Sequence, residues 1–85
     1  KKNMYYTYVL FSKKDRKPYI GWTDNLWERI KKHNQGGVPS TEWRRPLALI
    51  YYEACLNKKK AIAREKYFKT GFGRRFLKER LQIET

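Results

Sequence analysis

Residues that could do chemistry gather around one short stretch of the sequence, Tyr19-Ile20-Gly21. It ends an apolar run and leads into Thr23-Asp24-Asn25, which is typical of a helix N-terminus. Arg29 lies ten residues after Tyr19 on the helix that this predicts, and Tyr8 lies eleven residues before Tyr19 in a strand-like run. Two phenols and a guanidinium that converge where a sheet meets a helix indicate a functional site.

The net charge of the chain indicates which kind of molecule binds it. Its 85 residues fit one domain with one modest core. The 21 Lys and Arg residues far outnumber the 8 Asp and Glu residues, which gives a formal net charge of +13. A polyanion is the natural counterpart of such a surface, and nucleic acid is the commonest one. The alternative is a surface whose charge serves only solubility.

Cysteine content and hydropathy exclude several classes of protein. The single cysteine, Cys55, permits no internal disulfide and fits a reducing compartment, so we expect a cytoplasmic location. We expect Cys55 itself to be a small core residue. One Cys and one His cannot build a zinc site. The longest uncharged run, residues 3–12, is too short to span a bilayer, and no signal peptide is recognisable, so no membrane partner is expected.

Hydrophobic patterns predict an α/β (α+β) fold, in which helices flank a small three-stranded antiparallel sheet. Aromatic and β-branched runs predict the strands Tyr5 to Phe11, Pro18 to Trp22 and Leu47 to Glu53. Capping residues and apolar stripes predict the helices Asp24 to Asn34, Asn57 to about Thr70 and Arg74 to Ile83. We expect residues 1–85 to form one domain in which residues 1–4 are a tail.

The register of the first hairpin decides whether the two phenols meet. A loop of Ser12-Lys13-Lys14-Asp15 would place Tyr8 opposite Tyr19. Directly opposed residues of an antiparallel pair point to the same face, so the phenols would lie side by side. A slip of one residue would instead separate them onto opposite faces. Gly21 is expected to let the strand turn into the helix and to let backbone approach a substrate.

The second helix carries a carboxylate in an unusual place. Its apolar stripe comprises Ala61, Ile62 and Phe68, and Glu65 falls in the middle of that stripe. A carboxylate there is costly unless a cation meets it. Lys69 at i+4 is one candidate partner, although such a pair is usually worth little. The position on the stripe favours a more buried cation, such as Mg²⁺.

These residues resemble the GIY-YIG nuclease family over nearly the whole chain, from Tyr5 to about Leu81. The second family signature is intact as Tyr19-Ile20-Gly21, whereas Tyr6-Thr7-Tyr8 keeps only the final Tyr of the first. The ordered pattern continues with Thr23, Leu26, Arg29, His33, Arg45-Pro46 and Arg64-Glu65. The likeness is to small stand-alone members, similar to the N-terminal nuclease domain of the bacterial excision-repair incision subunit.

The resemblance implies a DNA endonuclease of low sequence specificity that acts in DNA repair or recombination. In the family, two tyrosines line the site, an arginine contacts phosphate and a glutamate binds one divalent metal; Tyr8, Tyr19, Arg29 and Glu65 match these positions. His33 matches a position where some members carry His, for proton transfer or phosphate contact. The implied metal is Mg²⁺ or Mn²⁺, with no small-molecule cofactor. A phenolate base at neutral pH requires nearby positive charge, because the ordinary pKa of Tyr is about 10.

The basic residues fall into two groups. The loop before the third strand and the late helices carry the group expected to bind DNA: Arg44, Arg45, Lys66, Lys69, Arg74 and Arg75. The hairpin tip carries a group that we interpret as solvated charge: Lys13, Lys14, Arg16 and Lys17. Contacts to phosphate would make binding salt-dependent and largely independent of base sequence.

Two other functions fit parts of the sequence. A non-catalytic nucleic-acid-binding module would keep the fold and the charge without cutting DNA. A subunit that docks on a larger repair complex would expose an apolar patch, for which Trp22, Trp27 and Trp43 are the candidates. We expect these three side chains to pack in the core instead.

Overall fold

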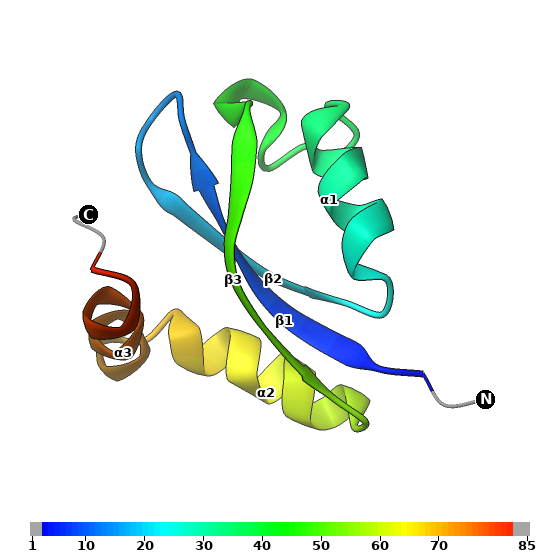
Figure 1. Ribbon diagram of the computed structural model, residues 1–85, viewed down its shortest axis with the longest axis vertical. Helices are drawn as coiled ribbons and strands as arrows, with labels where there is room; N and C mark the ends of the chain where they lie inside the picture. The colour runs from blue at the N-terminus through cyan, green and yellow to red at the C-terminus, as the bar shows by residue number, and fades with distance from the viewer. Residues whose placement is uncertain (1–2, 83–85) are drawn as a thin grey trace.

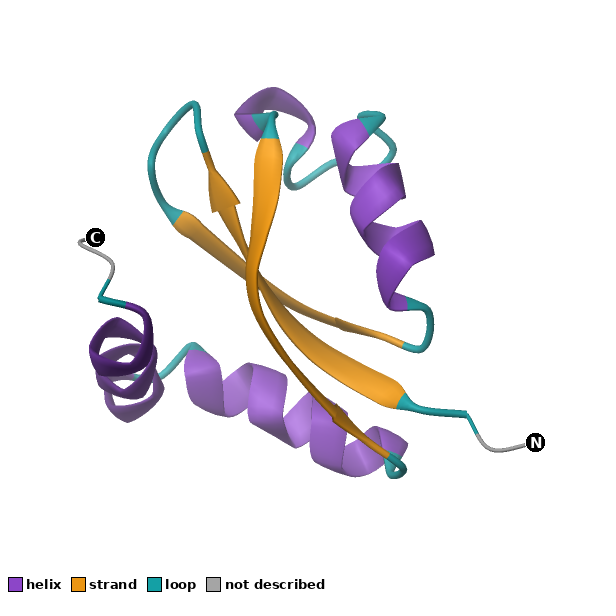
Figure 2. Ribbon diagram, viewed as in Figure 1, coloured by secondary structure: helices purple, strands orange, loops and turns teal. Residues whose placement is uncertain are grey.

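The computed structural model describes residues 3–82, and its elements confirm the predicted α+β fold (Figures 1 and 2). The strands are β1 (Tyr5–Ser12), β2 (Pro18–Thr23) and β3 (Leu47–Cys55). The helices are α1 (Leu26–Asn34), α2 (Lys58–Phe68) and α3 (Gly71–Leu81), and a short 3-10 turn, Glu42–Arg44, precedes β3. Ile83, the predicted last residue of the third helix, and residues 1–2 of the predicted tail lie outside the described residues. Within residues 3–82, no helix combines the length and apolar character needed to cross a membrane.

The sheet separates two layers of helix. Its strand order is β2–β1–β3 and both pairings are antiparallel, so β1 is central. Helix α1 covers one face of the sheet, and α2 and α3 cover the other (Figure 1). Because successive side chains of a strand alternate between faces, Tyr8 of β1 packs with Leu26 of α1, whereas Val9 packs with Phe68 of α2. Two small cores therefore lie back to back across β1.

The predicted hairpin register is wrong by two residues. Tyr8 pairs with Gly21, and Tyr19 pairs with Leu10. The loop begins one residue later than predicted because Ser12 stays in β1, where its Oγ accepts hydrogen bonds from the backbone N–H groups of Lys14 (3.2 Å) and Asp15 (3.1 Å). A shift of two residues preserves the alternation of faces, so the two phenols still point to the α1 side.

Gly71 and Gly73, which the predicted bounds leave between the second and third helices, belong to α3. This helix begins at Gly71, three residues before the predicted start, and Thr70 caps it by accepting a hydrogen bond from the N–H of Gly73 (3.1 Å). A Cβ on Gly73 would lie 2.0 Å from the carbonyl oxygen of Tyr67. The absence of a side chain at Gly73 therefore allows α3 to fold back directly against the end of α2.

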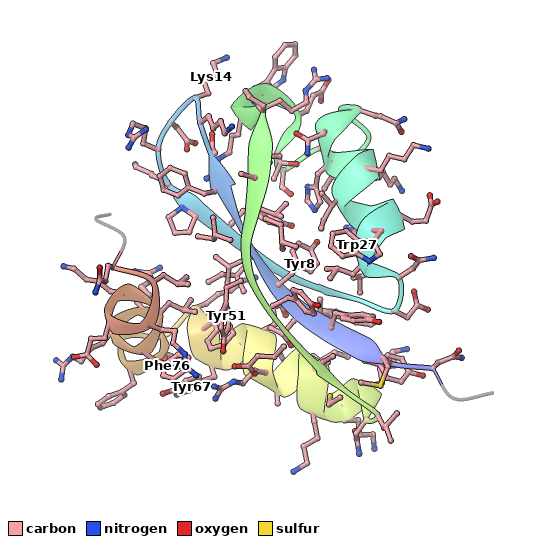
Figure 3. All side chains as sticks on the ribbon, in the orientation of Figure 1. Tyr8, Lys14, Trp27, Tyr51, Tyr67 and Phe76 are labelled. Atoms are coloured by element: carbon pink, nitrogen blue, oxygen red, sulfur yellow. The ribbon has the colours of Figure 1, made fainter. Side chains whose placement is uncertain are left out.

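Arg64, the residue before Glu65, holds helix α2 to the sheet. The Arg64 guanidinium pairs with the Glu53 carboxylate of β3 at 2.9 Å and lies 4.7 Å from the ring centroid of Phe68. Glu53 also accepts a hydrogen bond from the Tyr51 hydroxyl at 2.8 Å. Figure 3 shows Tyr51 on the side of the sheet that faces α2 and α3. This network fixes the rotation of α2, and with it the direction of Glu65.

The expectation that the tryptophans pack in the core is wrong for two of them. Trp27 is 67% exposed and Trp43 is 73% exposed, while Trp22 is half-buried. Trp27 lies outside the buried stripe of α1 and contacts Tyr52 of β3 edge to face (Figure 3). Cys55 is only partly buried at the end of β3 rather than a core residue. The exposed indoles meet the requirement of a docking surface, but a docking partner stays a prediction.

Candidate active site

Tyr8 occupies the middle of the site and depends on a glycine beside it. Its side chain extends from β1 towards α1 (Figure 3) and is fully buried. The ring passes over Gly21 of β2, where a Cβ would lie 2.5 Å from the Tyr8 hydroxyl oxygen and 2.7 Å from the carbon that bears it. Gly21 thus has a role that the sequence did not suggest, because it makes room for the phenol rather than for a turn.

Three of the predicted site residues join in one hydrogen-bonded group. The Tyr8 hydroxyl lies 2.9 Å from Nε2 of His33, and Arg29 Nε donates a hydrogen bond to the same oxygen at 3.4 Å. Both partners come from α1, one turn apart, because residues four apart share a helix face. The structure therefore brings a phenol, an imidazole and a guanidinium into mutual contact.

Tyr19 completes the cluster through its ring. Its centroid lies 5.1 Å from that of His33 in an edge-to-face arrangement. Its hydroxyl accepts a hydrogen bond from Ser40 Oγ at 3.3 Å. Tyr19 is half-buried whereas Tyr8 is fully buried, so the Tyr19 phenol is the one at the surface.

A buried threonine that the sequence analysis missed lies behind the imidazole. Thr41 Oγ1 is 2.7 Å from His33 Nδ1, and both residues have no exposed surface. Thr41 comes from the loop between α1 and β3, eight residues after His33. No pattern in the sequence marks it, because its relation to the site arises from how that loop folds back against α1.

Glu65 belongs to the helical layer on the opposite side of the sheet from α1 (Figure 1). It lies on α2, and its side chain is only 18% exposed. Its carboxylate pairs with Lys69 Nζ at 2.9 Å, which is the i+4 partner considered above. The structure therefore does not place Glu65 in hydrogen-bond contact with either phenol. Its charge contributes to the raised pKa of Tyr8, after burial, Arg29 and Tyr19, as described next.

Burial has the largest effect on the pKa values of Tyr8 and His33. It raises the pKa of the Tyr8 phenol; the Arg29 hydrogen bond and charge oppose this rise, and Tyr19 and Glu65 add slightly to it. Burial, followed by the charge of Arg29, lowers the pKa of His33 to about 4. At neutral pH the pair is therefore a neutral phenol next to a neutral imidazole. A preformed phenolate, which the sequence analysis considered, is not favoured by this environment.

A basic groove runs beside the cluster along the β2 edge. It has a volume of about 570 Å³ and lies between the start of β2 and the end of α2 with α3. Apolar and aromatic groups line part of it: Pro18, Tyr19, Ile20 and Leu77. Cations line the rest: Lys17, Lys69, Arg74 and Lys78. Tyr19 thus belongs both to the cluster and to the groove.

The groove changes the assignment of two lysines. Lys17, which the sequence assigns to the solvated charge of the hairpin tip, directly precedes β2 and lines the groove. Lys78 was not considered at all, although its spacing of four from Arg74 puts both on one face of α3. A second, shallower hollow of about 400 Å³ lies along α1 and includes Arg29, Lys31 and Lys32.

The other predicted DNA-binding residues lie apart from the groove. The Arg44 guanidinium pairs with Asp15 and donates to the carbonyl oxygens of Lys17 and Pro18, so it fastens the hairpin tip to the 3-10 turn. Arg45 Nε donates to a backbone carbonyl of the same turn at 2.8 Å. Lys66 and Arg75 are exposed on α2 and α3. A role for these four residues in DNA binding stays a prediction.

The buried imidazole predicts a specific dependence of stability on pH. Because the pKa of His33 falls from 6.5 when exposed to about 4 in the fold, the unfolded chain binds the extra proton first as pH falls. The free energy of unfolding should therefore decrease by about 2.5 kcal/mol from pH 7 to pH 4.5 through this group alone. Urea unfolding at a series of pH values measures it.

The control for this prediction is the His33→Gln variant, which has no imidazole to titrate. The pKa values of Asp15 and Glu53 are already lowered by their arginine partners, so their effects fall at more acidic pH. Between pH 7 and about pH 5, the variant should show a nearly flat stability profile. Parallel profiles for the wild type and the variant would contradict the burial of a neutral His33.

The fold and this cluster together define a class of protein, the small α+β catalytic domains that carry paired tyrosines on a three-stranded sheet. The sequence model described as the GIY-YIG catalytic domain matches residues 4–79. The chain therefore belongs to the GIY-YIG family, which is a nuclease family.

Relatives of similar size support this assignment. The chain is 48% identical over 67 residues to a UPF0213 protein of Clostridium perfringens, which covers 78% of this chain and 71% of that protein. It is 41% identical over 68 residues to the UPF0213 protein YazA of Bacillus subtilis, covering 79% of this chain and 68% of that one. The solution NMR structure of a UPF0213 protein from Bacillus halodurans matches with a TM-score of 0.54 and 32% identity, over 87% of this chain and 81% of that one.

Proposed function

We propose that this protein is a metal-dependent endonuclease that hydrolyses DNA phosphodiester bonds with low sequence specificity, in DNA repair or recombination. The observation that carries the proposal is the hydrogen-bonded group of Tyr8, Arg29 and His33. The ring of His33 contacts Tyr19 of the edge strand β2, and Tyr19 also lines the basic groove. We also expect this activity to be cytoplasmic.

The neutral phenol and the neutral imidazole suggest how water is activated. Tyr8 is buried in the free protein, so this scheme requires that substrate binding uncovers its oxygen. The oxygen of a water molecule then attacks phosphorus while its proton passes to the Tyr8 oxygen. The proton of Tyr8 passes at the same time to Nε2 of His33, 2.9 Å away. The bond from phosphorus to the leaving oxygen breaks, and that oxygen takes up a proton from solvent. This transfer avoids a free phenolate, which burial of Tyr8 disfavours.

Arg29 binds the phosphate of the substrate, and Tyr19 orients it. Arg29 is partly exposed and keeps donors other than the one directed to Tyr8, and a guanidinium can bind two oxygens of a phosphate at once. Negative charge on those oxygens grows in the transition state, so a fixed cation there lowers the barrier. Tyr19 presents its hydroxyl from the half-buried side of the cluster and orients the same group.

The chemistry of Glu65 fits a divalent cation that is shared with the substrate. Residues 3–82 hold no group of three or more acidic, Cys or His side chains that could bind a metal by themselves. Mg²⁺ commonly binds one or two carboxylates and completes its shell with waters and substrate phosphate, so the single Glu65 carboxylate suffices in that mode. When bound there, Mg²⁺ or Mn²⁺ would supply positive charge against the phosphate. When no metal is bound, Lys69 neutralises the Glu65 carboxylate at 2.9 Å.

DNA is the partner that the groove fits best. A cationic wall formed by Lys17, Arg74 and Lys78 matches a row of phosphates, and backbone contacts carry little base specificity. Binding should therefore weaken steeply with salt and vary little with sequence.

Cleavage of a supercoiled plasmid in Mg²⁺ tests the proposed function. Tyr8→Phe, Arg29→Gln and Glu65→Gln should each lower the rate by about 10²–10⁴-fold, because each removes a proton-transfer or charge-stabilising group. A chelator should stop cleavage by the wild type. Tyr52→Phe is the matched control, since Tyr52 pairs with Tyr8 in the sheet but its side chain is 46% exposed.

Two outcomes would reject the enzyme. Wild-type cleavage no faster than that of Glu65→Gln or Arg29→Gln would show that the site does not cut DNA. Salt-dependent binding of DNA with no metal-dependent cleavage would instead identify the non-catalytic nucleic-acid-binding module, which the charge of +13 also supports.

A further inference from the structure

We propose that Thr41 is a positioning residue, which holds His33 in the tautomer that carries its proton on Nδ1, so that Nε2 accepts the proton of Tyr8. Its catalytic consequence rests on the function proposed above, whereas the tautomer itself is a property of the folded protein. Thr41 touches neither phosphate nor water in this scheme and acts only through the imidazole.

The contacts of Thr41 are built into the fold. Its Oγ1 lies 2.7 Å from His33 Nδ1, a short distance for a hydrogen bond between neutral groups. Its hydroxyl also donates to the Val38 carbonyl at 3.4 Å, and its backbone N–H donates to the same carbonyl at 3.0 Å. Val38, Thr41 and His33 are all buried, so this arrangement is shielded from water.

Counting donors and acceptors decides the direction of each bond. Arg29 can only donate, so the Tyr8 oxygen accepts one hydrogen bond from it. If Nε2 of His33 also carried a proton, the Tyr8 oxygen would accept a second bond. The hydrogen of the Tyr8 hydroxyl would then have no acceptor among the contacts of the described residues.

The opposite arrangement satisfies every group. Tyr8 donates to Nε2, Nδ1–H of His33 donates to Thr41 Oγ1, and the Thr41 hydroxyl donates to the Val38 carbonyl. Every buried side-chain nitrogen and oxygen among the described residues has a hydrogen-bond partner, and this arrangement also gives the Tyr8 hydroxyl hydrogen an acceptor. The chain of bonds runs in one direction, from the phenol to a backbone carbonyl that cannot give a proton back.

The direction matters because only one ring nitrogen can receive a proton. With Nδ1 already protonated and bound to Thr41, Nε2 is the free base, and it points at the phenol. Tyr19 packs edge to face against the ring with centroids 5.1 Å apart and limits its rotation. Without the Thr41 hydroxyl, the proton can move to Nε2, and the imidazole would then oppose loss of the Tyr8 proton.

Nuclear magnetic resonance tests the tautomer without any assay of cleavage. His33 is the only histidine in the chain, so its ring nitrogens give an unambiguous signal in ¹⁵N-labelled protein. We expect a pyridine-like Nε2 and a pyrrole-like Nδ1 in long-range ¹H–¹⁵N correlation spectra of the wild type at neutral pH. A pyrrole-like Nε2 in the wild type would overturn the proposal, even if no Thr41 variant folds.

Thr41→Val and Thr41→Ser provide the kinetic test. Valine keeps the shape of threonine but removes the hydroxyl, and we expect kcat to fall by about 10- to 100-fold with KM unchanged, since a misdirected base loses much of its contribution. Serine restores the hydroxyl and should restore both kcat and the wild-type tautomer. A Thr41→Val protein that is folded by its thermal unfolding curve and cuts at the wild-type rate would overturn the proposal.

The two tests separate failure of this proposal from failure of the proposed function. Absence of cleavage by the wild type rejects the nuclease and removes the catalytic role of Thr41. The hydrogen-bond assignment then stands or falls on the nitrogen signals alone. Cleavage that depends on Tyr8 but not on the Thr41 hydroxyl rejects Thr41 as a positioning residue and leaves the nuclease intact.

Discussion

The Gly21→Ala variant is expected to lose DNA cleavage by about 10²-fold or more and to lose about 1–3 kcal/mol of unfolding free energy. The added Cβ would lie 2.5 Å from the Tyr8 hydroxyl oxygen. The Tyr8 ring is rigid and fully buried, so relief requires the whole ring to move. That movement separates its oxygen from His33 and Arg29 together. Plasmid cleavage and urea unfolding of the purified variant measure the two effects.

The structure offers a matched control for this substitution. Gly71 is exposed at the start of α3, and a Cβ there meets nothing within 4 Å. Gly71→Ala should therefore keep wild-type cleavage and leave stability equal or slightly higher, by about 0.4–1 kcal/mol, since alanine restricts the unfolded chain. A Gly21→Ala protein that cuts as well as Gly71→Ala would contradict the position assigned to Tyr8.

The Gly73→Ala variant is expected to show the largest loss of stability among single methyl additions at these glycines. Its Cβ would lie 2.0 Å from the Tyr67 carbonyl oxygen and 2.6 Å from the Phe68 Cα, both of them backbone atoms that no rotamer change can move. We expect a loss of about 3 kcal/mol or more. A chain of this length has a total stability of only about 4–13 kcal/mol, so much of the protein would be unfolded on mild heating.

Gly71→Ala, two residues earlier in the same helix, again isolates the steric effect from the change of residue type. Circular dichroism during thermal unfolding compares the two variants directly. Equal melting temperatures would show that α3 does not pack as closely against the end of α2 as the structure has it. The basic groove would then have a different shape, because α3 supplies Arg74, Leu77 and Lys78 to it.

Much of the fold follows from local patterns that the sequence displays. Continuous apolar runs identify the three strands, and capping by Asn25 and Asn57 marks where α1 and α2 begin. The register of the hairpin does not follow, because it depends on Ser12 keeping its place in the sheet while its hydroxyl closes the turn. The start of α3 was missed for a similar reason, since glycine there serves close packing rather than a break.

The candidate site was predictable only in part. The ordered motif named Tyr8, Tyr19, Arg29 and His33, and the structure gathers these four. The motif could not name Thr41 or Lys78, because each reaches its place through a contact that depends on the fold rather than through a sequence spacing. Nor does a motif indicate protonation: burial of Tyr8 and His33, which determines their pKa values, is a property of the packed layers. The exposure of Trp27 likewise depends on how α1 rotates against the sheet.

Strand β2 is an edge of the sheet, and its outer backbone groups have no neighbouring strand within residues 3–82. Tyr19 on this strand belongs to the phenol cluster, and Pro18 to Ile20 line the basic groove. An extended peptide that paired with β2 by β-augmentation would cover the phenol cluster and the basic groove at once without entering either of them. Under the proposed function, such a peptide would be a competitive inhibitor that binds through backbone hydrogen bonds, and an oligomer of this domain that remains active would leave the β2 edge open.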